Sequence, residues 1–248
     1  MSKLFPIHGK IKCSRCFEGA PVQWGKTFIE SNGWTLENNP GAWGSRNPEI
    51  LILGYSKGDR QAKKILSIPF DEIPFKGMRN NLTRILQKLG ILSLGESIDQ
   101  RIHGEENELA FGSLIRCSLG LWDSGKGAVR KSGGLIKASF REEPARQYIR
   151  NCSNEYLFNL PTRLKLILMM GNGDDYIGDC FNMMAEIHPE IKRINEVAYS
   201  NGAVIWVHLV HPSGAGMSHI KAWLEADNGK QAEKRKAAIE AVRSIGIG

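Results

Sequence analysis

The sequence predicts an α/β protein, a three-layer α/β/α fold around a central four-stranded parallel sheet. Short apolar runs bounded by Gly or Pro recur along the chain, as in strands buried on both faces of a sheet. Amphipathic stretches with helical spacing lie between these runs, and no internal repeat competes with the alternation. Strands that alternate with helices pack as a parallel sheet covered on both faces.

Four strands are expected, in chain order at 47–55, 109–119, 163–173 and 202–214. The segment 77–92 is the clearest helix between them, because it carries apolar residues at i, i+3, i+4 and i+7: Leu82, Ile85, Leu86 and Leu89. Two more helical patterns occupy 144–161 and 179–200. A C-terminal helical segment, 219–248, contains a basic amphipathic helix that packs its apolar face on the sheet or contributes to binding.

The chain has 248 residues with 42% hydrophobic content, which is enough to bury one sizeable core, so a single domain over 1–248 is expected. Lys and Arg number 33 against 26 Asp and Glu, and the net charge of +7 favours a phosphate-bearing partner or serves only for solubility. Without a membrane-length apolar run or a signal-peptide core, the sequence predicts a cytoplasmic protein that has no membrane partner. A monomer is expected.

The segment 118–144 interrupts the alternation. It contains five glycines and the cations Lys126, Arg130, Lys131, Lys137 and Arg141. It is expected to be a long, basic, Gly-rich surface insertion, and such loops are usually functional or disordered. Contact with a polyanion is one interpretation.

Polar or glycine-rich sequence follows each predicted strand, at 54–59, 113–117, 172–175 and 211–216. Open α/β sheets bind ligands at this edge. In "LVHPSGAG", Pro212 favours an extended His211, and Ser213 with its neighbouring glycines permits close approach of a ligand or phosphate. Spacing alone leaves open whether His211 is catalytic or structural.

Five cysteines, an odd number, argue against a disulfide framework in a cytosolic chain. Cys13 and Cys16 form a C-x2-C pair, Cys117 follows the second predicted strand, and Cys152 lies in a predicted helix. These four could hold an iron–sulfur cluster or zinc, or they could be buried without a metal. Cys180 is expected in the core.

The "HPSGAG" that follows the last predicted strand resembles the second signature motif of the uracil-DNA glycosylase superfamily. Further stretches resemble its motifs in the same order: "ILILGYSKG", "PFKGMRNNLTRILQKLGI" and "RLKLILMMGN". The four cysteines are similar in arrangement to those of its iron–sulfur families 4 and 5. The resemblance covers most of residues 13 to 216.

This resemblance implies hydrolysis of the bond between uracil, or a related deaminated base, and deoxyribose in double- or single-stranded DNA. His211 would stabilise the departing base and Asp59 would activate water. Phe75 would stack on the base, beside Gly54, Tyr55 and Ser113. Ser213, Gly214 and Ser56 would hold phosphates. Cys13, Cys16, Cys117 and Cys152 would hold a structural 4Fe-4S cluster, with zinc or no metal as alternatives.

The sequence departs from the family pattern at two of these positions. The first motif reads Gly54-Tyr55-Ser56-Lys57-Gly58, without a carboxylate before Asp59. Ser113 stands where the family has an asparagine that reads uracil, and Asn172 follows a different strand. Two alternatives stay open: a non-catalytic nucleic-acid-binding member of this fold, and an α/β protein that binds a small ligand at the strand ends.

Two other patterns are weak. "GNGDD" and "DSGKG" lack the G-x4-G-K-[ST] context of a phosphate-binding loop. Asp174, Asp175 and Asp179 could bind a divalent cation, but carboxylates also favour the first turn of a helix.

Overall fold

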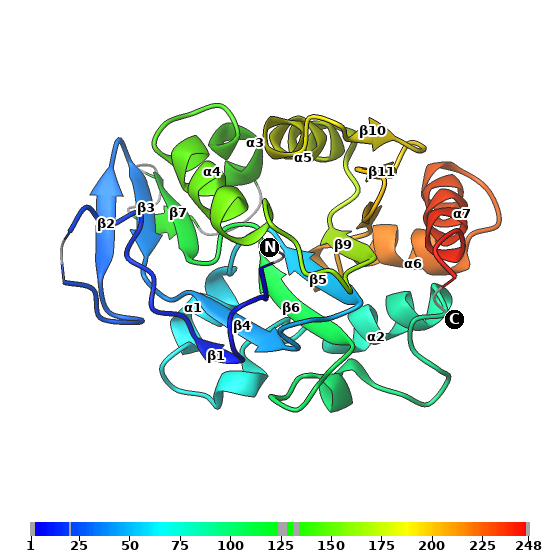
Figure 1. Ribbon diagram of the computed structural model, residues 1–248, viewed down its shortest axis with the longest axis horizontal. Helices are drawn as coiled ribbons and strands as arrows, with labels where there is room; N and C mark the ends of the chain where they lie inside the picture. Colours follow the sequence, from blue (N-terminus) through cyan, green and yellow to red (C-terminus); the bar gives the residue numbers. More distant parts are fainter. Residues whose placement is uncertain (1–2, 20, 124–127, 131–133, 247–248) are drawn as a thin grey trace.

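The computed structural model describes residues 3–19, 21–123, 128–130 and 134–246, which form a layered α/β fold (Figure 1). This confirms the predicted α/β class. The larger of the two sheets has eight strands. In spatial order they are β1 (Gly9–Lys10), β4 (Gly41–Gly44), β6 (Leu109–Ser113), β5 (Ile50–Gly54), β9 (Leu166–Met170), β12 (Ile205–Leu209), β11 (Ala198–Ser200) and β10 (Lys192–Arg193).

The four strands expected from the sequence lie side by side at the centre of this sheet, in the order β6-β5-β9-β12, and each neighbouring pair is parallel. The prediction that the sheet has four strands was wrong, because antiparallel strands extend it on both sides. These outer strands are only two to four residues long and carry no extended apolar run, which is why periodicity did not reveal them.

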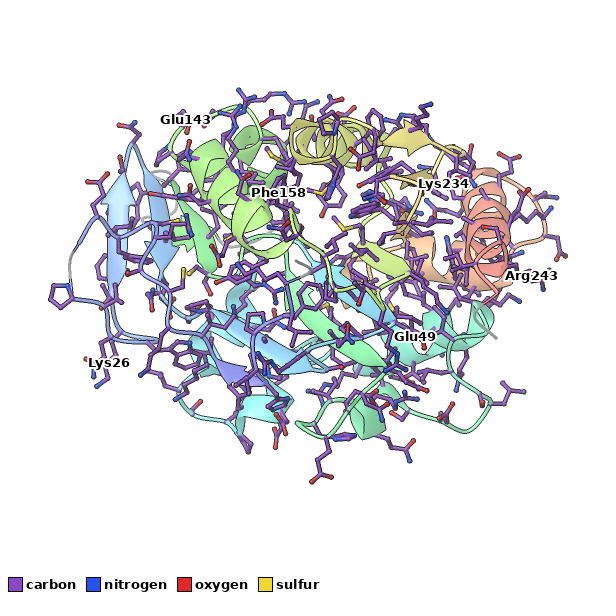
Figure 2. The ribbon with its side chains drawn as sticks, viewed as in Figure 1. Lys26, Glu49, Glu143, Phe158, Lys234 and Arg243 are labelled. Carbon is purple, nitrogen blue, oxygen red and sulfur yellow. The ribbon has the colours of Figure 1, made fainter. Side chains whose placement is uncertain are left out.

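Helices cover both faces of the sheet. Because successive strand residues point to opposite faces, Leu51 and Leu53 of β5 share one core with α3 (Leu135–Ser139), α4 (Ala145–Tyr156) and α5 (Asp174–Ile187). Ile50 and Ile52 share the other core with α2 (Arg79–Lys88), α6 (Met217–Glu225) and α7 (Lys230–Arg243). Side chains fill the space between sheet and helices (Figure 2). The short helices are α1 (Asp59–Lys64), η1 (Phe70–Glu72), η2 (Ile98–Arg101) and η3 (Gly214–Gly216).

A second sheet corrects two expectations. Its order is β2 (Phe28–Ser31), β3 (Trp34–Glu37), β7 (Ser118–Asp123) and β8 (Ala128–Arg130), and all its pairs are antiparallel. The expected strand at 109–119 is therefore two strands in different sheets. The expected loop at 118–144 contains β7, β8 and α3, whereas 124–127 and 131–133 lie outside the described residues. Trp34, Leu36 and Leu119 anchor this sheet in the core.

The helix expected at 179–200 was wrong at both ends. It begins earlier, at Asp174, and ends at Ile187. The end follows from Pro189, since a proline disfavours helical backbone in the residue before it, here His188. The C-terminal segment contains α6 and α7, as its helical pattern indicated. None of the helices in the described part of the chain is long and apolar enough to span a membrane.

Candidate functional site

A pocket of about 1110 Å³ lies at the carboxyl ends of the four parallel strands. Gly54 ends β5 and Ser113 ends β6, while Asn172 follows β9 and His211 follows β12, and all four residues line the pocket. Open α/β sheets bind ligands at this edge. The strand ends that the sequence singled out therefore meet in one cavity.

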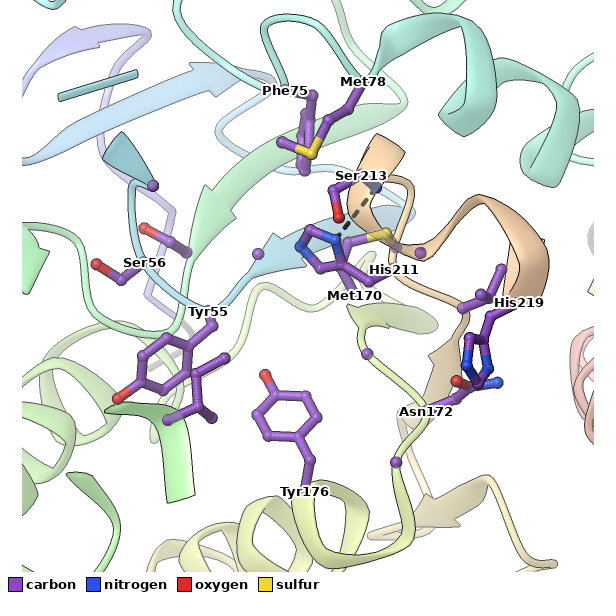
Figure 3. A pocket seen from close by; sticks show the side chains of 18 of the residues that line it. Tyr55, Ser56, Phe75, Met78, Met170, Asn172, Tyr176, His211, Ser213 and His219 are labelled. Atoms are coloured by element: carbon purple, nitrogen blue, oxygen red, sulfur yellow. Dashed lines mark hydrogen bonds between the residues drawn. The ribbon is translucent and has the colours of Figure 1, made fainter. Parts of the chain in front are cut away.

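Phe75 stands on one wall of this pocket (Figure 3). Its backbone φ of +54° lies in the left-handed region, which costs a non-glycine residue about 1 kcal/mol or more. The ring meets Phe111 edge-on, with 6.3 Å between centroids. Gly54 lies beside it, because a Cβ added to Gly54 would be 4.0 Å from the Phe75 ring. A strained backbone thus holds an aromatic ring next to a strand end that has no side chain.

His211 is exposed to the pocket, in the loop between β12 and α6. Its Nδ1 accepts a hydrogen bond from the backbone N–H of Ser213 at 3.2 Å (Figure 3). In the neutral ring the proton is therefore assigned to Nε2. Partial burial lowers the pKa of His211 below its ordinary value. The pocket consequently contains a neutral imidazole whose Nε2–H is not used by the loop contact at Nδ1.

The loop after His211 is fixed by the packing of α2. The Asn81 amide of α2 donates to the carbonyl oxygen of Pro212 at 3.0 Å, and Pro212 is buried. Ser213 and Gly214 both line the pocket, and the Ser213 hydroxyl does not cap the turn that follows. A Cβ added to Gly214 would meet nothing within 4 Å, so this backbone is open to a ligand.

The hydroxyls of Tyr55, Ser56 and Ser113 are engaged in the wall of the pocket. The Tyr55 hydroxyl is hydrogen-bonded to the hydroxyl of Ser139. Ser56 donates to the Cys117 carbonyl at 3.1 Å and accepts from the Leu119 N–H. Ser113 donates to the Ile115 carbonyl at 2.7 Å. Ser56 and Ser113 therefore offer a ligand lone pairs and no free proton.

Asp59 is the first residue of α1, but its side chain lies outside the part of the structure that is described. Nearby Gly58 and Gln61 line the pocket, and Gln61 donates to the Ile73 carbonyl at 3.0 Å. The start of α1 therefore lies at the cavity.

The three carboxylates at the start of α5 each face a cation. The pairs are Asp174 with Lys230 and Lys234, Asp175 with Lys137, and Asp179 with Arg141. These contacts lower the pKa of Asp174 to about 2, mainly through its hydrogen bonds to Lys230 and Lys234. The three groups point to separate partners and do not converge as cation ligands. Two cations of the expected basic insertion, Lys137 and Arg141, are likewise engaged.

Asn172 and Tyr176 are pocket residues to which the sequence analysis gave no role. Asn172 is buried and donates to the Gln231 side chain at 2.8 Å. In the sequence it follows a different strand from Ser113, but that strand, β9, lies between β5 and β12 in the sheet, so its end is central to the pocket. The Tyr176 hydroxyl points into the pocket (Figure 3). It makes no hydrogen bond to a nitrogen or oxygen atom of the described residues, and the nearest polar group is the Cys180 thiol.

The cysteines from three distant segments converge beside the pocket. Cys117 and Cys152 are buried, and Cys13 and Cys16 are partly buried. Burial raises the pKa of Cys117 to about 12, and the nearby Cys16 and Cys13 thiols add to this shift. The pKa of Cys152 is also raised, first by burial and then by the nearby Cys117 thiol. Asn151 donates to Sγ of Cys16 at 3.3 Å.

Four thiols are the right ligand type and number for a metal centre, but their side chains are not arranged around a common point. Within the described ranges, no group of three or more His, Cys, Asp or Glu side chains is arranged to hold a metal ion. A buried polar atom without a partner lies beside them. Nε of Arg116 makes no hydrogen bond in the described structure, and Arg116 lies close to Cys152. Sulfur ligands would supply acceptors there.

The fold and pocket define an α/β protein with a cavity at the carboxyl ends of its parallel strands. Comparison adds little to this class, since no family model and no curated protein matches the chain. Among solved structures, the chain is similar to SMUG2 from Pedobacter heparinus, with 10% identity over 82% of this chain and 78% of that chain and a TM-score of 0.42. That degree of similarity assigns no function to this chain.

Proposed function

We propose that the protein is a DNA glycosylase that hydrolyses the N-glycosidic bond of uracil or a related deaminated base. The observation that carries the proposal is the pairing of Phe75, an aromatic ring held on strained backbone, with His211, a neutral imidazole whose Nδ1 is already engaged. Both line the same strand-end pocket. The Phe75 ring is suited to stack on a planar base, and the His211 imidazole is suited to donate to a developing negative charge.

The base must leave the DNA stack to reach such a pocket. In the proposed complex it stacks on the Phe75 ring, beside Gly54. Stacking of a base on an aromatic side chain contributes about 1–3 kcal/mol. Asn172 and the Tyr176 hydroxyl then face its polar edge. Ser113 contributes only acceptor capacity, because its proton is used by the Ile115 carbonyl.

As the glycosidic bond breaks, the electron pair moves onto the base. The Nε2–H of His211 donates to the base oxygen on which charge develops. A fixed donor of this kind is worth about 10²–10³ in rate. The depressed pKa of His211 keeps the ring neutral, so the donor is present without a net charge to neutralise in the free enzyme. Asp59 remains the proposed base that activates water.

The strand adjoining the flipped base is held by the loop after β12. Ser213 supplies a hydroxyl, and Gly214 leaves the backbone open where η3 and α6 begin. Helix N-termini favour phosphate groups. Met217, the first residue of α6, is half exposed. Apolar side chains in such positions can wedge between base steps, and we assign Met217 this role.

We further propose a structural 4Fe-4S cluster on Cys13, Cys16, Cys117 and Cys152, with zinc as the alternative metal. The convergence of the thiols and the orphaned Arg116 Nε support it. A bound metal centre would cross-link the N-terminal segment to α4 and to the β6–β7 connection. Iron and sulfide content with broad visible absorbance, measured after anaerobic purification, tests it; colourless protein without metal would contradict it.

A second candidate is a DNA-binding protein of this fold without catalysis. One observation favours it: in the described part of the pocket, each carboxylate is ion-paired to a cation. If the Asp59 side chain does not reach the attacking water, the described part of the pocket offers no unpaired carboxylate to activate it.

The two candidates separate on uracil-containing single- and double-stranded oligonucleotides, with abasic sites as the readout and binding followed against salt concentration. The glycosylase proposal predicts abasic sites with wild type and with His103→Ala, a histidine outside the pocket, but far fewer with His211→Ala. Salt-dependent binding without abasic sites would support the second candidate. Absence of both would leave a small-ligand site.

A further inference from the structure

Lys57 is a buried cation between the pocket and the cysteines. It is only 4% exposed, and its Nζ donates to the backbone carbonyl of Arg116, the residue before Cys117. The Trp43 ring lies 6.0 Å from Nζ. Burial lowers the pKa of Lys57 to about 8. Among the charged groups that favour its protonated form, Cys117 acts most strongly, followed by Cys152 and then Glu37.

Arg116 is a second buried cation on the same side of the structure. It is 2% exposed, with Cζ over the Tyr156 ring at 5.0 Å and Nη1 donating to the Gly41 carbonyl at 3.3 Å. The side chain folds back on Gly112, where an added Cβ would be 1.9 Å from Nη1. Its Nε has no hydrogen-bond partner in the described structure. The groups that favour its charge are Tyr156 and Cys152.

In the described part of the chain, neither Lys57 nor Arg116 lies within ion-pair distance of a carboxylate. Burying a charge without a partner costs several kcal/mol per ion. Cys117 and Cys152 lie beside Lys57 together with the Glu37 carboxylate, which is not within ion-pair distance of Lys57. Cys152 lies beside Arg116 together with Tyr156. The thiols do not balance these charges while they are neutral. Thiolates bound to a metal do, since four of them on one divalent ion leave about two negative charges.

We propose that Lys57 and Arg116 are the counter-charges of an anionic metal–thiolate centre at Cys13, Cys16, Cys117 and Cys152, with Arg116 Nε–H donating to a ligand sulfur. The inference rests on the cysteine centre proposed above and adds the residues that stabilise its charge. The proposal also gives a reason for the lysine in "GYSKG" (54–58), because Lys57 would stabilise the charge of the metal centre.

The test uses the full chain, purified anaerobically, as wild type, Lys57→Met and Arg116→Met. Metal per chain and the rate of metal loss to excess chelator are measured for each. Lys88→Met removes an exposed charge on α2 and is the matched control. Arg116→Lys keeps the charge at this position and should recover most of the retention.

We expect both methionine variants to lose metal at least tenfold faster than wild type and Lys88→Met. With an iron–sulfur cluster, removal of a cation also disfavours the more negative reduced state. A tenfold change in that equilibrium lowers a one-electron potential by about 59 mV. The metal-free proteins give the opposite sign: apo Lys57→Met and apo Arg116→Met should melt at or above the temperature of apo wild type, because an uncompensated buried charge is gone.

Two results overturn the inference, and they are distinguishable. Wild type that binds no metal would remove the proposed cysteine centre and the inference with it. Wild type that binds metal, with methionine variants equal to it in retention and potential, would remove the inference alone. Apo methionine variants less stable than apo wild type would assign the two side chains a packing role and also contradict it.

Discussion

The backbone N–H of Ser213 donates a hydrogen bond to Nδ1 of His211 at 3.2 Å. This contact links the backbone turn after Pro212 to the protonation state of the ring, because Nδ1 can accept only when it carries no proton. The loop therefore prepares His211 as a neutral donor through Nε2. The same backbone turn presents Ser213 and Gly214 to the pocket.

Activity should depend on pH through His211. Its pKa lies below the ordinary value of about 6.5, so the neutral form predominates at neutral pH and persists as pH begins to fall. Single-turnover excision should be flat from about pH 7 to 8 and fall only once pH passes below the depressed pKa, where protonated Nδ1 loses its contact with Ser213. A rate that rises as His211 becomes protonated, with the pKa read by NMR, would contradict a neutral donor.

Stability should depend on pH through a different histidine. His208 in β12 is fully buried, and desolvation lowers its pKa to about 4 although it contacts the Gly171 carbonyl and the Tyr199 hydroxyl. Below about pH 6.5 the unfolded chain binds a proton that the folded chain does not. Stability should fall by about 3 kcal/mol from pH 6.5 to 4.

Urea unfolding at several pH values measures this slope, which His208→Gln should flatten. If the variant shows the same loss of stability between pH 6.5 and 4 as wild type, His208 is not the group responsible.

Tyr176→Phe should separate stability from recognition. The Tyr176 hydroxyl is buried at the pocket and, among the described residues, has only the weakly accepting Cys180 sulfur near it. Removing it from the free protein should leave the free energy of unfolding unchanged or raise it by up to about 1 kcal/mol. If the hydroxyl contacts the base, kcat/KM should fall about tenfold. A more stable variant with unchanged kcat/KM would show that the base does not use this hydroxyl.

Gly112→Ala and Gly178→Ala make a matched pair. A Cβ at Gly112 would overlap Arg116 Nη1 at 1.9 Å, whereas a Cβ at Gly178 in α5 would meet nothing within 4 Å. Gly112→Ala should destabilise the protein by about 1–3 kcal/mol through overpacking. Gly178→Ala should stabilise it by about 0.5–1 kcal/mol, because alanine has the better helix propensity. Equal effects in thermal melts would refute the tight packing of Arg116.

The central strands could be predicted because each is a mostly apolar five-residue segment buried by helices on both faces, and "LILMM" of β9 is the clearest. Once the strands were located, the residues at their carboxyl ends could be proposed as pocket residues. The second sheet could not be predicted in the same way. Its strands alternate only weakly, and β7, "SLGLWD", pairs with β3 some eighty residues earlier in the chain.

At the site, His211, Phe75 and Ser213 could be proposed from short motifs, and the structure brings them to one pocket. The place of Asn172 in the pocket could not be predicted, because the order of strands in the chain does not give their order in the sheet. β9 follows β5 and β6 in the chain but lies between β5 and β12 in the sheet, so Asn172 comes to the centre of the pocket. The engagement of the Ser56 and Ser113 hydroxyls was equally invisible, since their partners are backbone carbonyls set by the turns after β5 and β6.

The most direct measurement of the central claim is the single-turnover rate of free uracil release from a uracil-containing oligonucleotide by wild type and His211→Ala, with DNA binding measured in parallel. We expect release by wild type, a rate about 10²–10³-fold lower for His211→Ala, and DNA affinity within about twofold. Release at the wild-type rate by His211→Ala, or no release by wild type that binds the DNA, would contradict the proposed role of His211 as the donor to the departing base.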